Sequence, residues 1–268
     1  MINLIQNTIG ALGRKSSFVG FLNTYIGASI ACSLRLLDGS YTGSSIRVRR
    51  SSDNSEQDIG FVDNILDTSS LLIFVGSGDG FVSKWYDQSG NAKDMIQATA
   101  SRQGQIAASG VVYLDGGLPV IRAVNGSTGM ISNYSATDAP TSKQFFAVVK
   151  SNYASVMLFG TASGGNDYCY FGDSTTSTSI DRNIALSSEL LNNQSFTYTT
   201  RADVYNGLSS QSILSASSVF SYGASFALGY IPNSSYYSMY DMQEFIVFEN
   251  QTDQIAKVTA INNHYSAY

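Results

Sequence analysis

Five acidic residues in turn-rich stretches have the clearest potential for chemistry. They are Asp87, Asp167, Asp173, Glu189 and Glu244. Cleavage of a glycosidic bond with retention needs two carboxyl groups about 5 Å apart, one of them protonated at the working pH. None of the five forms a recognisable pair by spacing, and a pair formed across a sheet leaves no signature in spacing. Turn capping and pairing with arginines are therefore the favoured roles, and no catalytic residue is assigned.

A strand pattern and a turn bring basic and acidic side chains into one region. Ile46 and Val48 alternate with Arg47 and Arg49, which is typical of a strand with one apolar and one polar face. Asp87 begins the run Asp-Gln-Ser-Gly-Asn, in which such side chains accept hydrogen bonds from turn amides. We expect Asp87 to pair with Arg47 or Arg49 and so form a structural clasp.

The same region and a tyrosine-rich loop supply the candidate ligand contacts. Trp85 could stack on a sugar with Asp87 and Gln88 beside it, although a single tryptophan in a strand is more often a core residue. Tyrosines among serines and asparagines form adaptable recognition surfaces and also suit subunit contact. The loop before the last predicted strand holds Tyr236, Tyr237 and Tyr240. Burial as strand filler is the alternative for most of the 17 tyrosines.

Composition argues against several classes of function. The 268 residues carry a net charge of -5 and have a pI of about 4.7. A sequence-independent nucleic-acid binder needs a basic face, so no nucleic-acid partner is expected. Cys32 and Cys169 lie outside any C-x-x-C pair, and His264 is the only histidine. We therefore expect no metal site and no cofactor, with the two thiols either free or joined by one long-range disulfide.

Residues 1–28 differ from the rest of the chain. They lack the basic stretch and apolar core of a signal peptide, and the sequence has no apolar run long enough to span a membrane. An amphipathic segment ahead of a domain often docks on a partner. The candidate assembly residues are Ile2, Leu4, Ile5, Ile9, Leu12, Phe18 and Phe21. Packing of this segment on its own domain is an equally supported alternative.

Period-two patterns from residue 29 to the C-terminus predict roughly ten to fourteen short strands, typical of a β-sandwich. One strand is predicted over 202–205, with Asn206 and Gly207 as its hairpin turn. The sequence thus predicts an N-terminal extension, 1–28, and a single all-β sandwich domain, 29–268.

Two stretches change to helical spacing. One helix is predicted after Asp67, a good N-cap residue, with Leu71 and Val75 on one face. The other ends the domain and is predicted within 252–265, where four apolar residues share one helical face. They are Ile255, Val258, Ile261 and Tyr265.

Several motifs resemble the catalytic-domain family of α-L-arabinofuranosidase B, whose domains also recur in bacteriophage virion proteins. The motifs are Cys32-Ser-Leu-Arg-Leu-Leu, Tyr41-Thr-Gly, Ile46-Arg-Val-Arg-Arg-Ser-Ser-Asp-Asn, Asp58-Ile-Gly-Phe and Trp85-Tyr-Asp-Gln-Ser-Gly-Asn. The resemblance is clear over 32–91 and implies a concanavalin A-like, jelly-roll β-sandwich. The chain departs from the enzymes of that family, which carry adjacent cysteines in the active site, because Cys32 and Cys169 stand apart.

From this resemblance we expect a bacteriophage virion structural protein: a capsid fibre or decoration subunit, or a tail appendage. Such a protein is made in the host cytoplasm, contacts other virion proteins through residues 1–28, forms a homo-oligomer and has host-surface glycans as candidate ligands. Enzymatic activity is not favoured. The alternatives are a glycoside hydrolase of the arabinofuranosidase type and a freestanding lectin-like carbohydrate-binding module. An active cleft with two facing carboxylates would favour the hydrolase.

Overall fold

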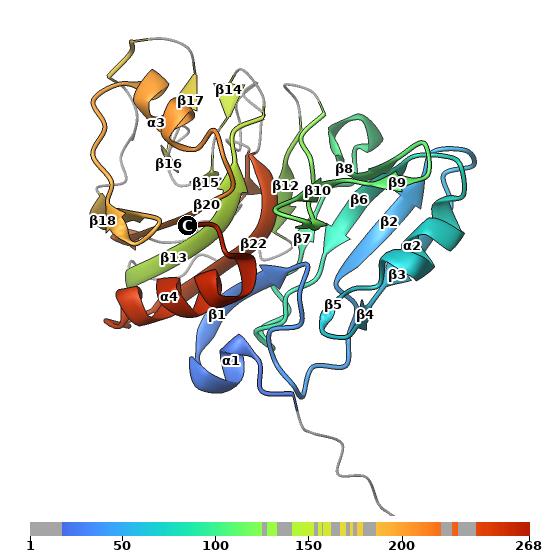
Figure 1. The fold of residues 1–268 in the computed structure, drawn as a ribbon, viewed down its shortest axis with the longest axis horizontal. Helices are drawn as coiled ribbons and strands as arrows, with labels where there is room; N and C mark the ends of the chain where they lie inside the picture. Colours follow the sequence, from blue (N-terminus) through green and yellow to red (C-terminus); the bar gives the residue numbers. More distant parts are fainter. Residues whose placement is uncertain are drawn as a thin grey trace, which may run out of the picture.

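The computed structural model describes residues 18–124, 128–132, 141–152, 155–156, 158–161, 167–169, 172–173, 176–178, 186–220, 227–229 and 240–268. At some of these strand positions only the backbone is described. Two antiparallel sheets form a sandwich that ends in a C-terminal helix (Figure 1). The predicted all-β sandwich with a terminal helix is therefore confirmed.

The first sheet has six described strands in the order β1-β22-β13-β20-β18-β19. Its long central strands are buried on both faces, so each contains an uninterrupted apolar run, Phe145–Val149 in β13 and Phe245–Phe248 in β22, rather than an alternating pattern. The strands are β1 (Ala28–Ser33), β13 (Thr141–Lys150), β18 (Leu186–Leu191), β19 (Gln194–Ser195), β20 (Ser212–Phe220) and β22 (Asp241–Glu249).

The second sheet has ten described strands and runs β16-β15-β21-β12-β7-β6-β2-β3, with β8 paired to β6 and β9 to β8. Ile46 and Val48 of β2 face the core, and Arg47 and Arg49 face outward, as the alternation predicts. The strands are β2 (Ile46–Arg50), β3 (Glu56–Ile59), β6 (Gly80–Trp85), β7 (Met95–Ile96), β8 (Gly104–Ala108), β9 (Val111–Val112), β12 (Met130–Ser132), β15 (Phe159–Thr161), β16 (Asp167–Cys169) and β21 (Ala227–Leu228).

Short ribbons and helices complete the described fold. The ribbons are β4 (Phe61–Val62) with β5 (Ile65–Leu66), β10 (Leu114–Asp115) with β11 (Leu118–Pro119), and β14 (Ser155–Val156) with β17 (Gly172–Asp173). The helices are α1 (Phe21–Thr24), α2 (Thr68–Val75), α3 (Arg201–Gly207) and α4 (Gln254–Tyr265), with the 3-10 turn η1 (Ala100–Arg102). In the described part of the chain, no helix is long and apolar enough to cross a membrane.

The sequence placed two of the three longer helices correctly. Asp67 caps α2 by accepting the amide of Ser70 at 2.9 Å. Helix α4 also lies where it was predicted, but Ile255 is 62% exposed and is not part of its buried face. The strand predicted over 202–205 is wrong, because those residues form α3.

A second core lies outside the first sheet, beneath α1 and α4 (Figure 1). Phe21 packs there with its ring centroid 6.2 Å from that of Phe248. Phe21 and Leu22 are both buried, so the part of the N-terminal segment that the structure describes packs on its own domain. Phe18 is half-buried beside it. The other candidate assembly residues, Ile2 to Leu12, lie outside the described residues.

Candidate functional site

The turn after β6 fastens β1 to β6 through Asp87. Its Oδ1 accepts the amides of Ala31 at 2.8 Å and of Ser89 at 3.0 Å. Its Oδ2 accepts the Ser89 hydroxyl at 2.7 Å and the Lys93 amide at 2.9 Å. Asp87 is therefore a clasp, but one that holds backbone amides.

Arg47 and Arg49 have other partners, so the predicted pairing with Asp87 is wrong. Arg47 lies opposite Asp58 in the β2–β3 pair and binds it with two hydrogen bonds of 2.7 and 2.9 Å. Arg49 donates to Gln103 at 2.7 Å. Both arginines project from the outer face of their sheet, whereas Asp87 is buried next to β1.

The residues expected to contact a ligand are mostly internal. Trp85 and Tyr240 are fully buried, and the Trp85 indole nitrogen has no hydrogen-bond partner among the residues that the structure describes. Gln88 is 3% exposed, and its amide group bonds the backbone of Ser33, Arg35 and Leu37. Burial leaves these side chains and Asp87 no surface for a ligand, which corrects that expectation. Tyr236 and Tyr237 lie outside the described residues.

The five acidic residues singled out from the sequence lie in different environments. Asp87 is bound to amides, and Glu244 is fully buried in an ion pair with Arg35. Asp167 and Asp173 are placed by their backbones in β16 and β17, and their side chains lie outside the description. Glu189, on β18, is half-buried and accepts a hydrogen bond from the Tyr198 hydroxyl.

Glu189 is held by a phenol that a tight turn brings back to it. The turn between β18 and β19 uses Asn192 and Asn193 with φ of 51° and 62°, a left-handed conformation that asparagine tolerates. The Tyr198 hydroxyl donates to Glu189 Oε2 at 2.5 Å. The ring of Phe196 lies 5.0 Å from that of Tyr198, centroid to centroid. A carboxylate fixed in this way can serve as a nucleophile or a base.

Helix α3 follows Tyr198 and packs against β17 in the same corner. A capping box begins it, because Thr200 accepts the Asp203 amide while Asp203 accepts the amides of Thr199 and Thr200. These backbone hydrogen bonds lower the pKa of Asp203 to about 2. A Cβ on Gly172 would lie 3.0 Å from the Tyr205 amide nitrogen, so glycine permits the close approach. The backbone of Asp173 is thereby placed beside α3.

Comparisons with known proteins identify the family of this chain and the solved structures that share its fold. The model of the alpha-L-arabinofuranosidase B catalytic family matches residues 26–184, more than half of the chain. The chain belongs to this family. A comparison with curated proteins finds no match.

Three solved structures of arabinofuranosidases share the fold of this family member. One is a GH54 α-L-arabinofuranosidase mutant soaked with 4-nitrophenyl α-L-arabinofuranoside, at 14% identity and a TM-score of 0.59. A second is a GH54 enzyme soaked with a cyclic sulfate inhibitor, at 15% and 0.58. A third is complexed with arabinofuranosyl-α-1,2-xylobiose, at 14% and 0.61. Each alignment covers 90% of this chain and 63% of the other, so the chain spans under two thirds of their length.

In this member of the arabinofuranosidase B catalytic family, the motif residues around Trp85 that carry the sequence resemblance stabilise the fold. Asp87 and Gln88 bond backbone groups, and Trp85 fills the core. The family match ends five residues before Glu189 (184 against 189), so it does not include that carboxylate. Among the residues described, no cluster of three or more His, Cys, Asp or Glu side chains could hold a metal ion.

Half-buried His264 and buried Asp241 have opposite effects on the stability of this family member as pH changes. Burial, followed by the charge of Arg35, lowers the pKa of His264 from 6.5 to about 4. Burial raises the pKa of Asp241 from 3.8 to about 6, against bonds from the Ala123 amide and Arg122. His264 therefore costs stability as pH falls from 6.5 towards 4, whereas Asp241 adds stability as pH falls from 6 towards 3.8.

His264→Gln is expected to gain stability relative to the original chain when pH drops from 7 to 4.5, by about 1–2 kcal/mol after allowance for partial exposure of the ring. Asp241→Asn should change in the opposite direction over the same interval. Urea unfolding at the two pH values measures both. A stability difference that is independent of pH for His264→Gln would contradict the assignment.

Proposed function

We propose that this chain is a glycoside hydrolase domain that acts on α-L-arabinofuranosides. The observation that carries the proposal is the family match over residues 26–184. The shared fold over 90% of the chain supports it, because the similar structures were solved with arabinofuranosyl ligands. The substrate is part of the proposal and is tested by the hydrolysis assay below.

Glu189 is proposed as one of the two catalytic carboxylates. Its half-buried position and the 2.5 Å hydrogen bond from Tyr198 hold this carboxylate in one orientation. Asp173 and Asp167 are the proposed sources of the second carboxyl group, Asp173 because its backbone lies beside α3. A separation of about 5 Å would give retention of configuration, and about 6.5–9.5 Å would give inversion.

Hydrolysis of 4-nitrophenyl α-L-arabinofuranoside by the purified chain tests the proposal. Release of 4-nitrophenol is expected, with no release from the matching β-D-xylopyranoside. Binding of arabinose-substituted oligosaccharides without hydrolysis would support the lectin-like module instead. The absence of both hydrolysis and binding would overturn the proposal.

The role as a bacteriophage virion subunit, with its homo-oligomer, virion partners and location, stays a prediction. A glycan-cleaving domain is compatible with such a role, because a particle can carry a hydrolase on its surface. Light scattering of the purified chain, with and without residues 1–17, tests whether that segment drives assembly.

A further inference from the structure

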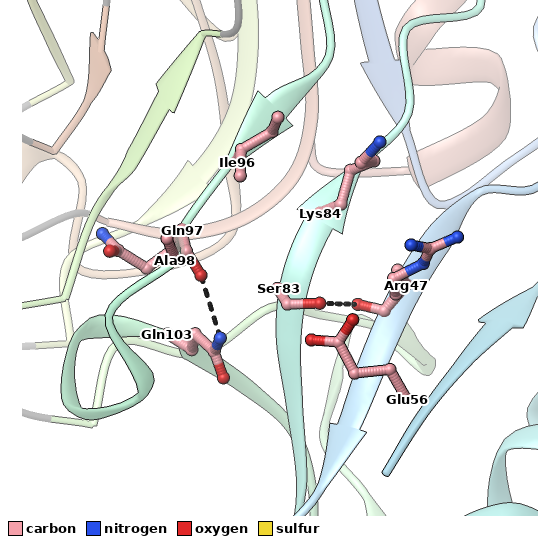
Figure 2. A pocket seen from close by; sticks show the side chains of 8 residues that line it. All are labelled: Arg47, Glu56, Ser83, Lys84, Ile96, Gln97, Ala98 and Gln103. Carbon is pink, nitrogen blue, oxygen red and sulfur yellow. Dashed lines mark hydrogen bonds between the residues drawn. The ribbon is translucent and has the colours of Figure 1, made fainter. Parts of the chain in front are cut away.

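A polar hollow lies on the outer face of the second sheet, and we call it the outer-sheet pocket. Its volume is about 240 Å³, below the roughly 300–1,000 Å³ of sites for drug-sized ligands. That space suits one or two sugar rings of a longer chain. Figure 2 shows the side chains that line it: Arg47, Glu56, Ser83, Lys84, Ile96, Gln97, Ala98 and Gln103.

A bulge in β6 shapes the pocket. Arg47 pairs with Lys84 and Val48 with Val82, so Ser83 is an extra residue between two regular pairs. The Ser83 carbonyl accepts the Gln97 amide at 2.9 Å. Bulges bend a strand, redirect its side chains and are frequent beside functional sites. This one places Ser83 and Lys84 at the pocket.

One wall of the pocket is fixed before any ligand arrives. Gln103 accepts from Arg49 at 2.7 Å. It also donates to the Gln97 carbonyl at 2.9 Å (Figure 2). The Gln97 side chain accepts the Thr99 amide at 3.0 Å. Gln97 and Gln103 are 4% and 3% exposed. A wall already held by hydrogen bonds loses little conformational entropy when a ligand binds.

The charges of the pocket favour a neutral ligand with several hydroxyls. Arg47 is paired with Asp58, and Lys84 lies 3.4 Å from Asp94. Glu56 makes no side-chain hydrogen bond or salt bridge with any residue that the structure describes, although its charge acts on Arg47 beside it. A carboxylate accepts two hydroxyls at once, and it repels anions.

We infer that the outer-sheet pocket binds a neutral oligosaccharide, with two sugar hydroxyls on Glu56 and the apolar face of the ring against Ile96 and Ala98. The pocket lies on β2, β3 and β6, across the molecule from β18 (Figure 1). It would hold a polysaccharide at a distance from Glu189 on β18. The choice of polysaccharide rests on the proposed function.

Affinity electrophoresis in gels containing arabinoxylan or branched arabinan tests the inference, with polygalacturonate as an anionic comparison. We expect the neutral polymers to retard the chain and polygalacturonate to leave it unretarded. Glu56→Ala should weaken binding about tenfold, the loss expected for hydrogen bonds to a charged group. Gln57→Ala, the neighbouring exposed residue outside the pocket, should bind as the original chain does.

A second variant, Ala98→Arg, puts a long cation at the exposed edge of the pocket and should weaken binding to a similar degree. Unchanged retardation of both Glu56→Ala and Ala98→Arg would overturn the pocket assignment, as would the absence of retardation by any neutral polymer. Failure of the proposed function is scored separately, as the absence of 4-nitrophenol release from the small arabinofuranoside.

Discussion

Glu189→Gln is expected to lower the rate of 4-nitrophenyl α-L-arabinofuranoside hydrolysis by about a thousandfold or more. A carboxylate that attacks the sugar or transfers a proton cannot be replaced by an amide, which has neither the charge nor a transferable proton of the right strength. The amide oxygen can still accept from Tyr198, which now donates at 2.5 Å, so the fold should be retained. Steady-state rates and thermal unfolding separate the two effects.

Tyr198→Phe should reduce the same rate by about tenfold, because it removes the bond that orients Glu189 but leaves the carboxylate in place. Asp53→Asn is the matched control, since Asp53 lies in the exposed β2–β3 turn, across the molecule from β18 (Figure 1). Full activity of the Glu189→Gln variant would show that Glu189 is not a catalytic residue. The assay would then pass to Asp167→Asn and Asp173→Asn.

The sequence predicted elements whose signals are local. Alternation in β2 showed which side chains face the core, and a capping residue located α2. The error at α3 also has a local cause. Thr200 and Asp203 form a capping box, but Asn206-Gly207 is also typical of a hairpin turn and so favours a strand over 202–205. Three-residue spacing of hydroxyl and acid was the signal that would have found the helix.

The clasp illustrates why partners are harder to predict than faces. The sequence predicts Arg47 on the polar face of a strand and Asp87 in a turn, but whether the two residues meet depends on the register of the strands. The turn between β2 and β3 fixes that register and sets Arg47 opposite Asp58, only eleven residues later in the chain. Glu189 and Tyr198 are likewise linked through the turn at Asn192 and Asn193. The Arg47–Asp58 pair can therefore be found from the sequence once the turn is located. The register of β18 and β19 sets Phe196 beside Glu189, so the contact with Tyr198 is not given by the turn alone.

Arg35 and Glu244 form an ion pair that no sequence pattern announces, because 209 residues separate them. Arg35 donates to Glu244 at 2.7 and 2.9 Å, and the side chain of Glu244 is inaccessible to solvent. Ser33 and Tyr265 add hydroxyl donors at 2.8 and 3.2 Å. Burial by itself lowers the pKa of Arg35, but the charge and hydrogen bonds of Glu244, together with Tyr265, outweigh burial and raise that pKa.

This ion pair joins the sheet to both helices that cover it. The Arg35 guanidinium lies 5.7 Å from the ring centroid of Phe21 in α1 and 5.3 Å from that of Tyr265 in α4. Arg35→Met leaves Glu244 as a buried charge without a cation. We expect it to lower the free energy of unfolding by about 3–5 kcal/mol, the usual cost of removing one partner from a buried pair. Urea unfolding at pH 7 measures the loss.

The double variant Arg35→Met/Glu244→Gln should recover much of that loss, because the amide is uncharged and still accepts from Ser33 and Tyr265. Arg47→Met is the matched control. Its pair with Asp58 has the same two-bond geometry, but both side chains are 39% exposed, so its removal should cost at most about 1 kcal/mol. Equal losses for Arg35→Met and Arg47→Met would show that burial does not set the strength of the pair. Equal losses for the single and double variants would show that the cost comes from lost packing of Arg35 on Phe21 and Tyr265, since the unpaired charge is absent from the double variant.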